Sequence, residues 1–386
     1  MFAAASETFA ITAKVCPAKT GPARRKVTGF LLFGGGMQTI GTPGLWATFT
    51  LVVLAALAVD FLVLRSSGAH RVSFREAVLW SLAWVVLALL FNLGLWWWLD
   101  GHAGRAVANE IGLEFLTGYV VEKSLSVDNI FVIAMIFGSL AVPPRYQHRV
   151  LFWGILGALV MRGAMIGVGT ALVTRFHWVL YLFGGFLILT AVKMLVMKEK
   201  EEHPENNPLV RWIRKFSPVT REYHGQHFFV KAGSSASAEA PEPGAPVVAD
   251  PVVAAAPAGK WLITPLAVAL VLIEFTDLIF AVDSIPAIFA ITSDPFLVFT
   301  SNVFAILGLR SLYFALAGMI DKFRYLKPAL ALVLMIVGGK MLAAKWLKVW
   351  LGESFNFTIL GVILAVLATG VVTSLIVGRR NESPAS

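Results

Sequence analysis

Cysteine is almost absent from this chain of 386 residues, in which Cys16 is the single one. A lone cysteine excludes an intramolecular disulfide framework and any metal site built on cysteine thiolates. Charged residues are also scarce: they make up 14% of the chain, whereas soluble domains contain about 25%. With 58% hydrophobic residues, this composition predicts an all-α, polytopic membrane protein that lies in the lipid bilayer.

The basic excess does not indicate a nucleic-acid partner. The net charge is +9, but the chain has no basic patch interleaved with aromatic residues. A secretory signal is missing too, because the basic cluster Arg24, Arg25 and Lys26 follows the weakly apolar part of the N-terminal segment. We therefore expect residues 1–40 to be a disordered tail or a start assigned too early, with Met37 as the alternative first residue.

Apolar runs long enough to cross a bilayer predict about nine transmembrane helices. These are 45–64, 76–98, 116–138, 149–172, 177–197, 261–285, 296–318, 327–344 and 357–377. They divide the chain into a first membrane half (41–197), a charged and then Ala/Pro-rich cytoplasmic linker (198–260), expected to be disordered in its second part, a second membrane half (261–378) and a short tail (379–386). Lys and Arg gather in alternate loops, so the positive-inside rule predicts an inner-membrane protein with its N-terminus outside and its C-terminus in the cytoplasm.

Two of the apolar segments carry carboxylates at membrane depth. Glu122 and Asp128 lie in the third predicted span, and Glu274, Asp277 and Asp283 lie in the sixth. A carboxylate near the bilayer centre costs about 2.5–3.5 kcal/mol even on insertion scales. These side chains are therefore expected to face the protein interior and to be neutralised by a proton, a basic partner or a cation.

Polar residues repeat in the same order in both halves. Each acidic segment is followed by a span with a central arginine (Arg162, then Arg310) and by a lysine (Lys193, then Lys340). Since each unit has three helices, two consecutive copies insert in opposite senses, which predicts a 3+3 inverted repeat with the two acidic helices face to face. Interrupted helices are expected at the polar run Ser124–Asn129 and at Pro286.

The acidic segments offer oxygen ligands alone. Carboxylates, together with Asn129 and Ser284, suit Mg²⁺, Ca²⁺ or Mn²⁺ and argue against a dedicated zinc or copper site. Asp128 and Asp283 fall off the stripes formed by the other polar residues, so an unwound turn at each is hypothesised to re-aim them. Carboxylates serve a proton path equally well, and that choice stays open.

The opposing interpretation is that the charges are structural ion pairs. Arg162 and Arg310 lie in mid-span and are expected to pair with the carboxylates when the site is empty. Lys193 and Lys340 lie near span ends, where snorkelling to the interface explains them. Asp60, near the end of the first span, is expected to be an interfacial cap and not a ligand.

Three blocks resemble the signature segments of the TerC family of bacterial integral membrane proteins. They are FLTGYVVEKSLSVDNIFV (115–132), IEFTDLIFAVDSIPAIFAIT (273–292) and TSNVFAILGLRSLYFALAGM (300–319). The resemblance covers about residues 40–377. The family is named for tellurium resistance and is grouped with the LysE-like exporters. The resemblance therefore implies a role in metal homeostasis by export of a divalent cation, foremost Mn²⁺. It also implies that the acidic residues are the ligands and that no cofactor is permanently bound.

Two further functions compete with transport. The protein could be a membrane anchor or scaffold of a stress-response complex, with residues 198–260 as its docking surface and with other copies or complex members as partners. An intramembrane enzyme is not expected, because the chain shows neither a GxGD pattern nor a nucleophile–base set.

Overall fold

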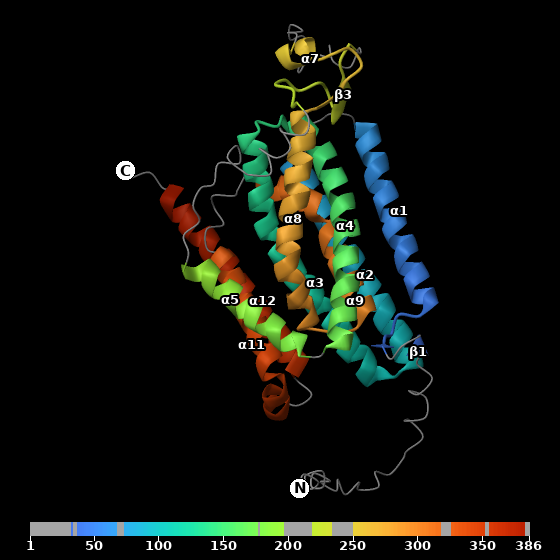
Figure 1. Ribbon diagram of the computed structural model, residues 1–386. Coiled ribbons are helices and arrows are strands. Elements are labelled where there is room, and N and C mark those ends of the chain that lie inside the picture. The colour runs from blue at the N-terminus through green and yellow to red at the C-terminus, as the bar shows by residue number, and fades with distance from the viewer. Residues whose placement is uncertain are drawn as a thin grey trace, which may run out of the picture.

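The computed structural model describes residues 32–33, 37–67, 73–176, 178–196, 218–233, 250–317, 326–351 and 355–382. Most of them are helical (Figure 1): α1 (Pro43–Ser67), α2 (Phe74–His102), α3 (Arg105–Ser139), α4 (Pro144–Arg175), α5 (Val179–Val196), α7 (Pro251–Ala255), α8 (Pro265–Phe289), α9 (Pro295–Leu307), α10 (Leu309–Leu316), α11 (Leu326–Leu351) and α12 (Phe355–Glu382). Two antiparallel strand pairs complete the chain: β1 (Leu32–Phe33) with β2 (Met37–Gln38), and β3 (Phe229–Lys231) with β4 (Trp261–Ile263).

Proline or a capping carboxylate fixes the start of several long helices. Pro144, Pro265 and Pro295 occupy the first position of α4, α8 and α9, where the missing N–H has no intrahelical partner to lose. Asp294 caps α9 by accepting a hydrogen bond from the backbone N–H of Phe296 at 2.8 Å. Its other oxygen accepts from Ile40 N at 2.7 Å, which ties the segment before α1 to the start of α9.

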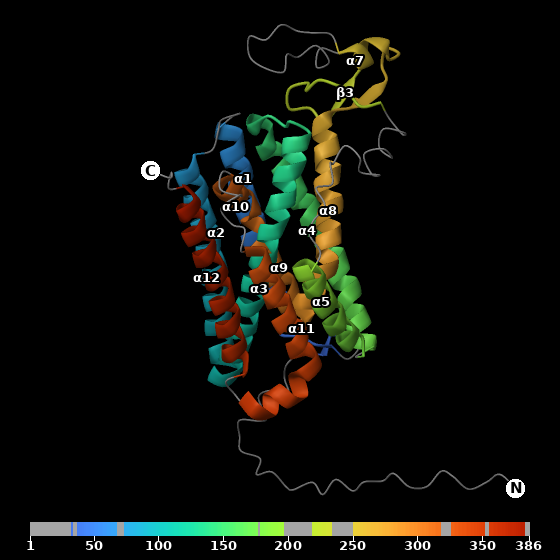
Figure 2. The same ribbon diagram turned by 90° about the vertical axis from the view of Figure 1, so that its left-hand side faces the viewer.

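The helices form one bundle whose centre is α3, α4, α8 and α9. Figures 1 and 2 show α1 and α2 beside this centre, and α5, α11 and α12 grouped together at its other side. Aromatic residues fill the contact between α9 and the first helices, where Phe49, Phe115, Phe296 and Phe304 are all buried. The large apolar surfaces left exposed, such as Leu51 on α1, lie on the outside, where lipid covers them.

Two glycines bring α5 and α11 into close contact. A Cβ on Gly338 would stand 2.9 Å from the carbonyl oxygen of Gly184, and one on Gly184 would stand 3.2 Å from that of Gly338. Small residues at helix–helix contacts are a recurring device in membranes, because backbones can then approach closely. The pair therefore joins α5, in the first half of the chain, to α11, in the second.

The described helices give a lower span count than nine. Six of them are long and apolar enough to cross a membrane: Pro43–Leu62, Phe74–His102, Pro144–Arg175, Val179–Val196, Pro265–Phe289 and Asn356–Ser374. A seventh is possible from α9 and α10, which are bent by 41° at Gly308. The predicted spans in α3 and α11 do not qualify, since α3 carries several charges and the apolar part of α11, Pro328–Ala343, is short.

The predicted helix interruptions are wrong. Both α3 and α8 run unbroken through Ser124–Asn129 and through Pro286. Ser124 Oγ donates to Val120 O at 2.6 Å, which satisfies the hydroxyl inside the helix. Pro286 removes one backbone donor to the carbonyl four residues earlier, yet α8 continues for three residues beyond it, to Phe289. The bend occurs instead at Gly308.

The prediction of a disordered linker is wrong for the described parts of that segment. Residues 218–233 and 250–264 form a small cap that contains β3, β4 and α7 and sits at the start of α8 (Figure 2). Asp250 is buried and accepts hydrogen bonds from the backbone N–H of Arg221 and Glu222. Tyr223 Oη donates to Leu140 O at 2.6 Å, so the cap contacts the end of α3. Residues 197–217 and 234–249, and most of the expected tail at 1–40, lie outside the described residues.

Candidate functional site

A buried arginine joins the two acidic helices. Arg162 of α4 is 2% exposed, and its Nη1 contacts Oε1 of Glu122 on α3, which is fully buried. Its Nη2 donates to Oδ1 of Asp277 on α8 at 2.8 Å, while Nε donates to Oδ2 of the same carboxylate at 3.2 Å. The guanidinium thus binds Asp277 in bidentate fashion and Glu122 at the same time. The prediction that the acidic helices meet inside the bundle, with Arg162 between them, agrees with this geometry.

Two neutral polar residues extend this ionic centre. Arg162 Nη1 also donates to Ser284 Oγ at 3.2 Å, and Asn129 Nδ2 donates to Asp277 Oδ1 at 3.3 Å. The centre, defined here as Glu122, Arg162, Asp277, Asn129 and Ser284, holds two carboxylates and one guanidinium. With all three groups ionised its formal charge is −1, so it favours one additional positive charge.

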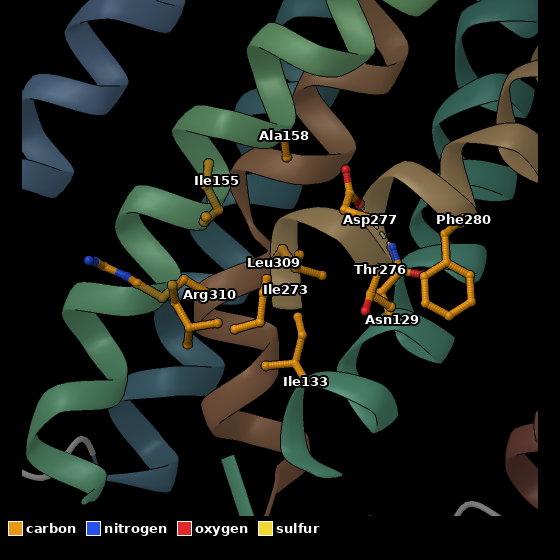
Figure 3. Close-up of a pocket in the computed structure, with 12 residues that line it drawn as sticks. Asn129, Ile133, Ile155, Ala158, Ile273, Thr276, Asp277, Phe280, Leu309 and Arg310 are labelled. Carbon is orange, nitrogen blue, oxygen red and sulfur yellow. Dashed lines mark hydrogen bonds between the residues drawn. The ribbon is translucent and has the colours of Figure 1, made fainter. Parts of the chain in front are cut away.

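A small cavity lies directly beside the centre. It encloses about 20 Å³, room for one water molecule, and both Asn129 and Asp277 line it. Figure 3 shows these two side chains joined by their hydrogen bond on one side of the cavity, with Thr276 next to them. Arg310 lines the opposite side, and its side chain extends away from Asp277. The cavity therefore offers oxygen atoms on one side and apolar side chains elsewhere.

Glu274 lies one turn before Asp277 on α8 and packs against α4. Its carboxylate touches Gly157 so closely that a Cβ at that position would overlap it. Its Oε2 is buried and has no hydrogen-bond partner among the described residues. Glycine at position 157 lets this carboxylate lie against α4, and a side chain there would force Glu274 to move. Glu274 is the next acidic group on α8 towards the start of that helix.

The other two predicted ligands point elsewhere. Asp283 accepts a hydrogen bond from Thr190 of α5 at 3.2 Å, on the side of α8 that faces the α5 helix. Asp128 follows Glu122 by six residues, which on a regular helix turns it roughly 120° away from the stripe that carries Glu122. Because α3 and α8 are not unwound, neither aspartate is re-aimed. Within the described part of the chain, no three His, Cys, Asp or Glu side chains gather as a metal would require.

The predicted pairing of Arg310 with the acidic helices is wrong. Arg310 Nη2 instead contacts Oδ1 of Asp60 on α1, and both side chains are largely buried. Asp60, 6% exposed, is therefore the partner of a buried ion pair and not an interfacial cap. The two residues are 250 positions apart, and no spacing in the sequence connects them.

The two lysines predicted to snorkel differ in their exposure. Lys193 is exposed near the end of α5, as expected for snorkelling, whereas Lys340 is 6% exposed, so the same prediction is wrong for it. Lys123, which follows Glu122, donates from Nζ to Ala305 O at 3.1 Å, just before the bend at Gly308. Sequence reasoning missed this contact, as it missed the fully buried Asn302 of α9.

Comparison with known proteins places this site in a family. The model of the "Integral membrane protein TerC family" matches residues 107–382, which include all of α3 to α12 except the first two residues of α3. The chain belongs to the TerC family. The resemblance seen in the three sequence blocks is thereby confirmed, and the protein is a multi-pass integral membrane protein.

Close TerC relatives occur in several bacteria. "Uncharacterized membrane protein STKORF319" of Myxococcus xanthus is 47% identical over 88% of this chain and 95% of its own length. "Putative membrane-bound redox modulator Alx" of Escherichia coli strain K12 is 44% identical over 90% of this chain and 98% of its own. A membrane protein of Rickettsia bellii is 36% identical over 87% and 99%. No solved structure matches the chain.

Proposed function

We propose that this TerC protein exports a divalent cation, foremost Mn²⁺, across the inner membrane in exchange for protons. The observation that carries the proposal is the ionic centre itself. Two carboxylates from different halves of the chain share one arginine, deep in the bundle and next to a small, mostly apolar cavity that Asn129 and Asp277 help to line. An intramembrane carboxylate pair of this kind is expected to mark an ion or proton path.

The arginine acts as an internal counter-ion in this proposal. While no cation is bound, Arg162 pairs with both Glu122 and Asp277, which lowers the cost of burying the two carboxylates and leaves one negative charge at the centre. A divalent cation that enters from the cytoplasm takes over the carboxylates, and the guanidinium moves aside. Oxygen ligands in this number suit Mn²⁺, Mg²⁺ or Ca²⁺, and family membership favours Mn²⁺ among them.

Protons are the coupling ions in this proposal. Once the cation leaves on the other side, the carboxylates either accept protons or pair again with Arg162. Glu274, Asp128 and Asp283 then serve as acidic stations on the way to and from the centre, and Asn129 and Ser284 contribute neutral oxygens. The cation is cargo in this scheme, so no resident cofactor and no enzymatic step are required.

An inverted repeat supports the transport proposal. Glu122 and Asp277 are 155 residues apart, and Asn129 and Ser284 are separated by the same 155 residues (277 − 122 and 284 − 129). Both pairs meet at the centre, so equivalent positions of the two halves converge on Arg162. We infer nine spans with a 3+3 inverted repeat, in which α3, α4 and α5 correspond to α8, α9–α10 and α11.

Flux measurements in reconstituted vesicles test the proposal. The protein is expected to move Mn²⁺, and the flux is expected to rise when the opposing compartment is more acidic. Glu122→Gln and Asp277→Asn should each lower the flux at least about tenfold, because each removes a charged ligand. Asp100→Asn is the matched control, since Asp100 pairs with Arg105 at the surface. Equal flux in all four proteins would rule out the ionic centre as the path.

The scaffold function remains a second candidate because the cap is ordered and contacts the bundle. The Escherichia coli relative is named "Putative membrane-bound redox modulator Alx", and a modulating role would suit a scaffold. Deletion of residues 234–249 separates the two functions. Loss of cellular resistance to metal stress with unchanged vesicle flux would favour the scaffold.

A further inference from the structure

Asn302 of α9 is fully buried, and neither its amide oxygen nor its amide nitrogen has a hydrogen-bond partner in the described part of the chain. Leaving a buried polar group unsatisfied costs about 1–3 kcal/mol. Native proteins rarely keep such a group without a water, an ion or a functional reason. Glu122 shows the same feature, because its second oxygen, Oε2, is also buried and unpartnered.

Contacts on either side of Asn302 fix its depth relative to α4. Val298, one turn before it, packs in one cluster with Ile166. Ile306, one turn after it, packs with Ile155 and Ala158. Since 298, 302 and 306 lie on one stripe of α9, Asn302 faces α4 between these contacts. Measured along the helix axes, that position lies within one helical turn, about 5.4 Å, of Arg162.

Contacts with α3 give the same depth. A Cβ on Gly118 would stand 3.0 Å from Ser301 Oγ, and Lys123 Nζ reaches Ala305 O. Glu122 therefore lies alongside the stretch of α9 that contains Asn302. Four helices thus each direct a polar side chain to one layer: Glu122 from α3, Arg162 from α4, Asp277 from α8 and Asn302 from α9.

We propose that Asn302 is a ligand of the transported cation and a determinant of its affinity. The inference rests on the proposed function and deepens it. When Arg162 releases the carboxylates, Glu122 and Asp277 alone give a divalent cation too few ligands. With no third carboxylate gathered there among the described residues, neutral oxygens have to complete the shell. The Asn302 amide oxygen is buried and unengaged at this depth, so it is available as a ligand.

A neutral ligand suits a transporter better than a third carboxylate. Affinity for hard cations rises with the number of charged ligands. A site of two carboxylates and neutral oxygens holds the cation without excess negative charge, so the cation can leave on the other side. Asn302 therefore keeps affinity low enough for release, which is a role distinct from neutralising charge.

Three variants test the role of Asn302. Asn302→Leu preserves size but removes the amide, and we expect Mn²⁺ binding to purified full-length protein to weaken at least about tenfold. Asn302→Asp adds a charged ligand, and we expect tighter Mn²⁺ binding with slower turnover in vesicles. Asn92→Leu removes another buried asparagine with an unpartnered oxygen, on α2 near Gly112, and should leave Mn²⁺ affinity unchanged.

The outcomes separate this inference from the proposed function. If the unmodified protein neither binds nor moves Mn²⁺, both are overturned. If it does both, and Asn302→Leu and Asn302→Asp bind Mn²⁺ as it does, only the role of Asn302 is overturned, and a buried water satisfies the amide. Should Asn302→Leu fail to fold, Asn302→Asp decides alone: unchanged affinity contradicts the inference, and increased affinity supports it.

Discussion

At the scale of single residues, the strongest electrostatic constraint is the sharing of Arg162 by two carboxylates. Each contact runs between groups that water scarcely reaches, since the side chain of Arg162 is 3% exposed and those of Glu122 and Asp277 are 1% and 11% exposed. A buried charge that loses its partner is strongly destabilising. The three side chains therefore act as one unit, and a change to any of them alters the others.

Removal of the guanidinium should destabilise the protein more than removal of all three charges. Arg162→Met leaves Glu122 and Asp277 uncompensated, and we expect a loss of about 3–5 kcal/mol in the free energy of unfolding. The triple variant Arg162→Met, Glu122→Gln, Asp277→Asn should recover much of that loss. Thermal unfolding in detergent measures both proteins. A triple variant no more stable than Arg162→Met would show that the three groups do not act as a unit.

At the same scale, the sequence predicts which charged residues need partners better than it predicts which partners they have. Glu122, Asp277 and Arg162 were predicted together because each is a charge inside an apolar run, and such charges need partners. Their choice of partner was harder. Arg310 has the same pattern as Arg162, yet it pairs with Asp60 of α1, because the bend at Gly308 and the position of α1 decide what lies near it. Neither fact is visible in hydropathy or spacing.

At the scale of helices, close approach of α5 and α11 depends on single glycines. Gly338→Ala places a Cβ 2.9 Å from Gly184 O and 3.0 Å from Ile188, so the helices have to separate. We expect a loss of about 1–3 kcal/mol, typical of overpacking. Gly339→Ala is the control, because nothing lies within 4 Å of its added Cβ. Unfolding temperatures of the two variants in detergent give the comparison, and equal values would contradict this packing.

The cap formed by residues 218–233 and 250–264 predicts a pH dependence. Burial opposes ionisation of Asp250, but hydrogen bonds from the backbone N–H groups of Glu222, Val252 and Arg221 outweigh it and hold its pKa below the usual value. Because the pKa of Asp250 is lowered in the folded state, ionised Asp250 stabilises the cap above about pH 4. This stabilisation is lost as the pH falls through the lowered pKa. The protection factors of the Arg221 and Glu222 amides, which are exchange rates corrected for the intrinsic rate at each pH, should therefore fall at low pH. In Asp250→Asn, the same protection factors should already be low at neutral pH and change little on acidification.

This cap shows why composition misled the prediction of disorder. Residues 250–260 are rich in alanine, proline and valine, which is typical of linkers. A single side chain reverses that expectation: Asp250 caps α7 through Val252 N and also binds the segment at 221–222. β4 then pairs with β3, which precedes it by about 30 residues. Long-range pairing of this kind leaves no periodic signal in the sequence.

At the scale of the whole molecule, the direction of each helix follows from the path of the chain. Figure 1 shows α1 beginning at the end of the bundle opposite to the cap, and α12 ending at the same end as the cap. The loops after α2 and α8 lie opposite to the cap, and the loop after α3 lies beside it, where Tyr223 contacts Leu140. An odd number of crossings, nine in our proposal, accounts for this arrangement. We propose that the end with the cap faces the cytoplasm, as the positive-inside rule predicts.

Thiol labelling in intact cells tests this topology, because the one native cysteine can be replaced. In a Cys16→Ser background, His102→Cys and Ser293→Cys should react with a membrane-impermeant reagent added outside. Ala141→Cys and Arg221→Cys should react only after the membrane is opened, since their loops lie at the end that carries the cap. All four positions are exposed or loop residues, so access depends on the side of the membrane. Labelling of Ser293→Cys only from inside would show that α8 does not cross the membrane. α3 and α8 would then not cross in opposite directions, and the proposal of two inverted halves that share one ionic centre would fail.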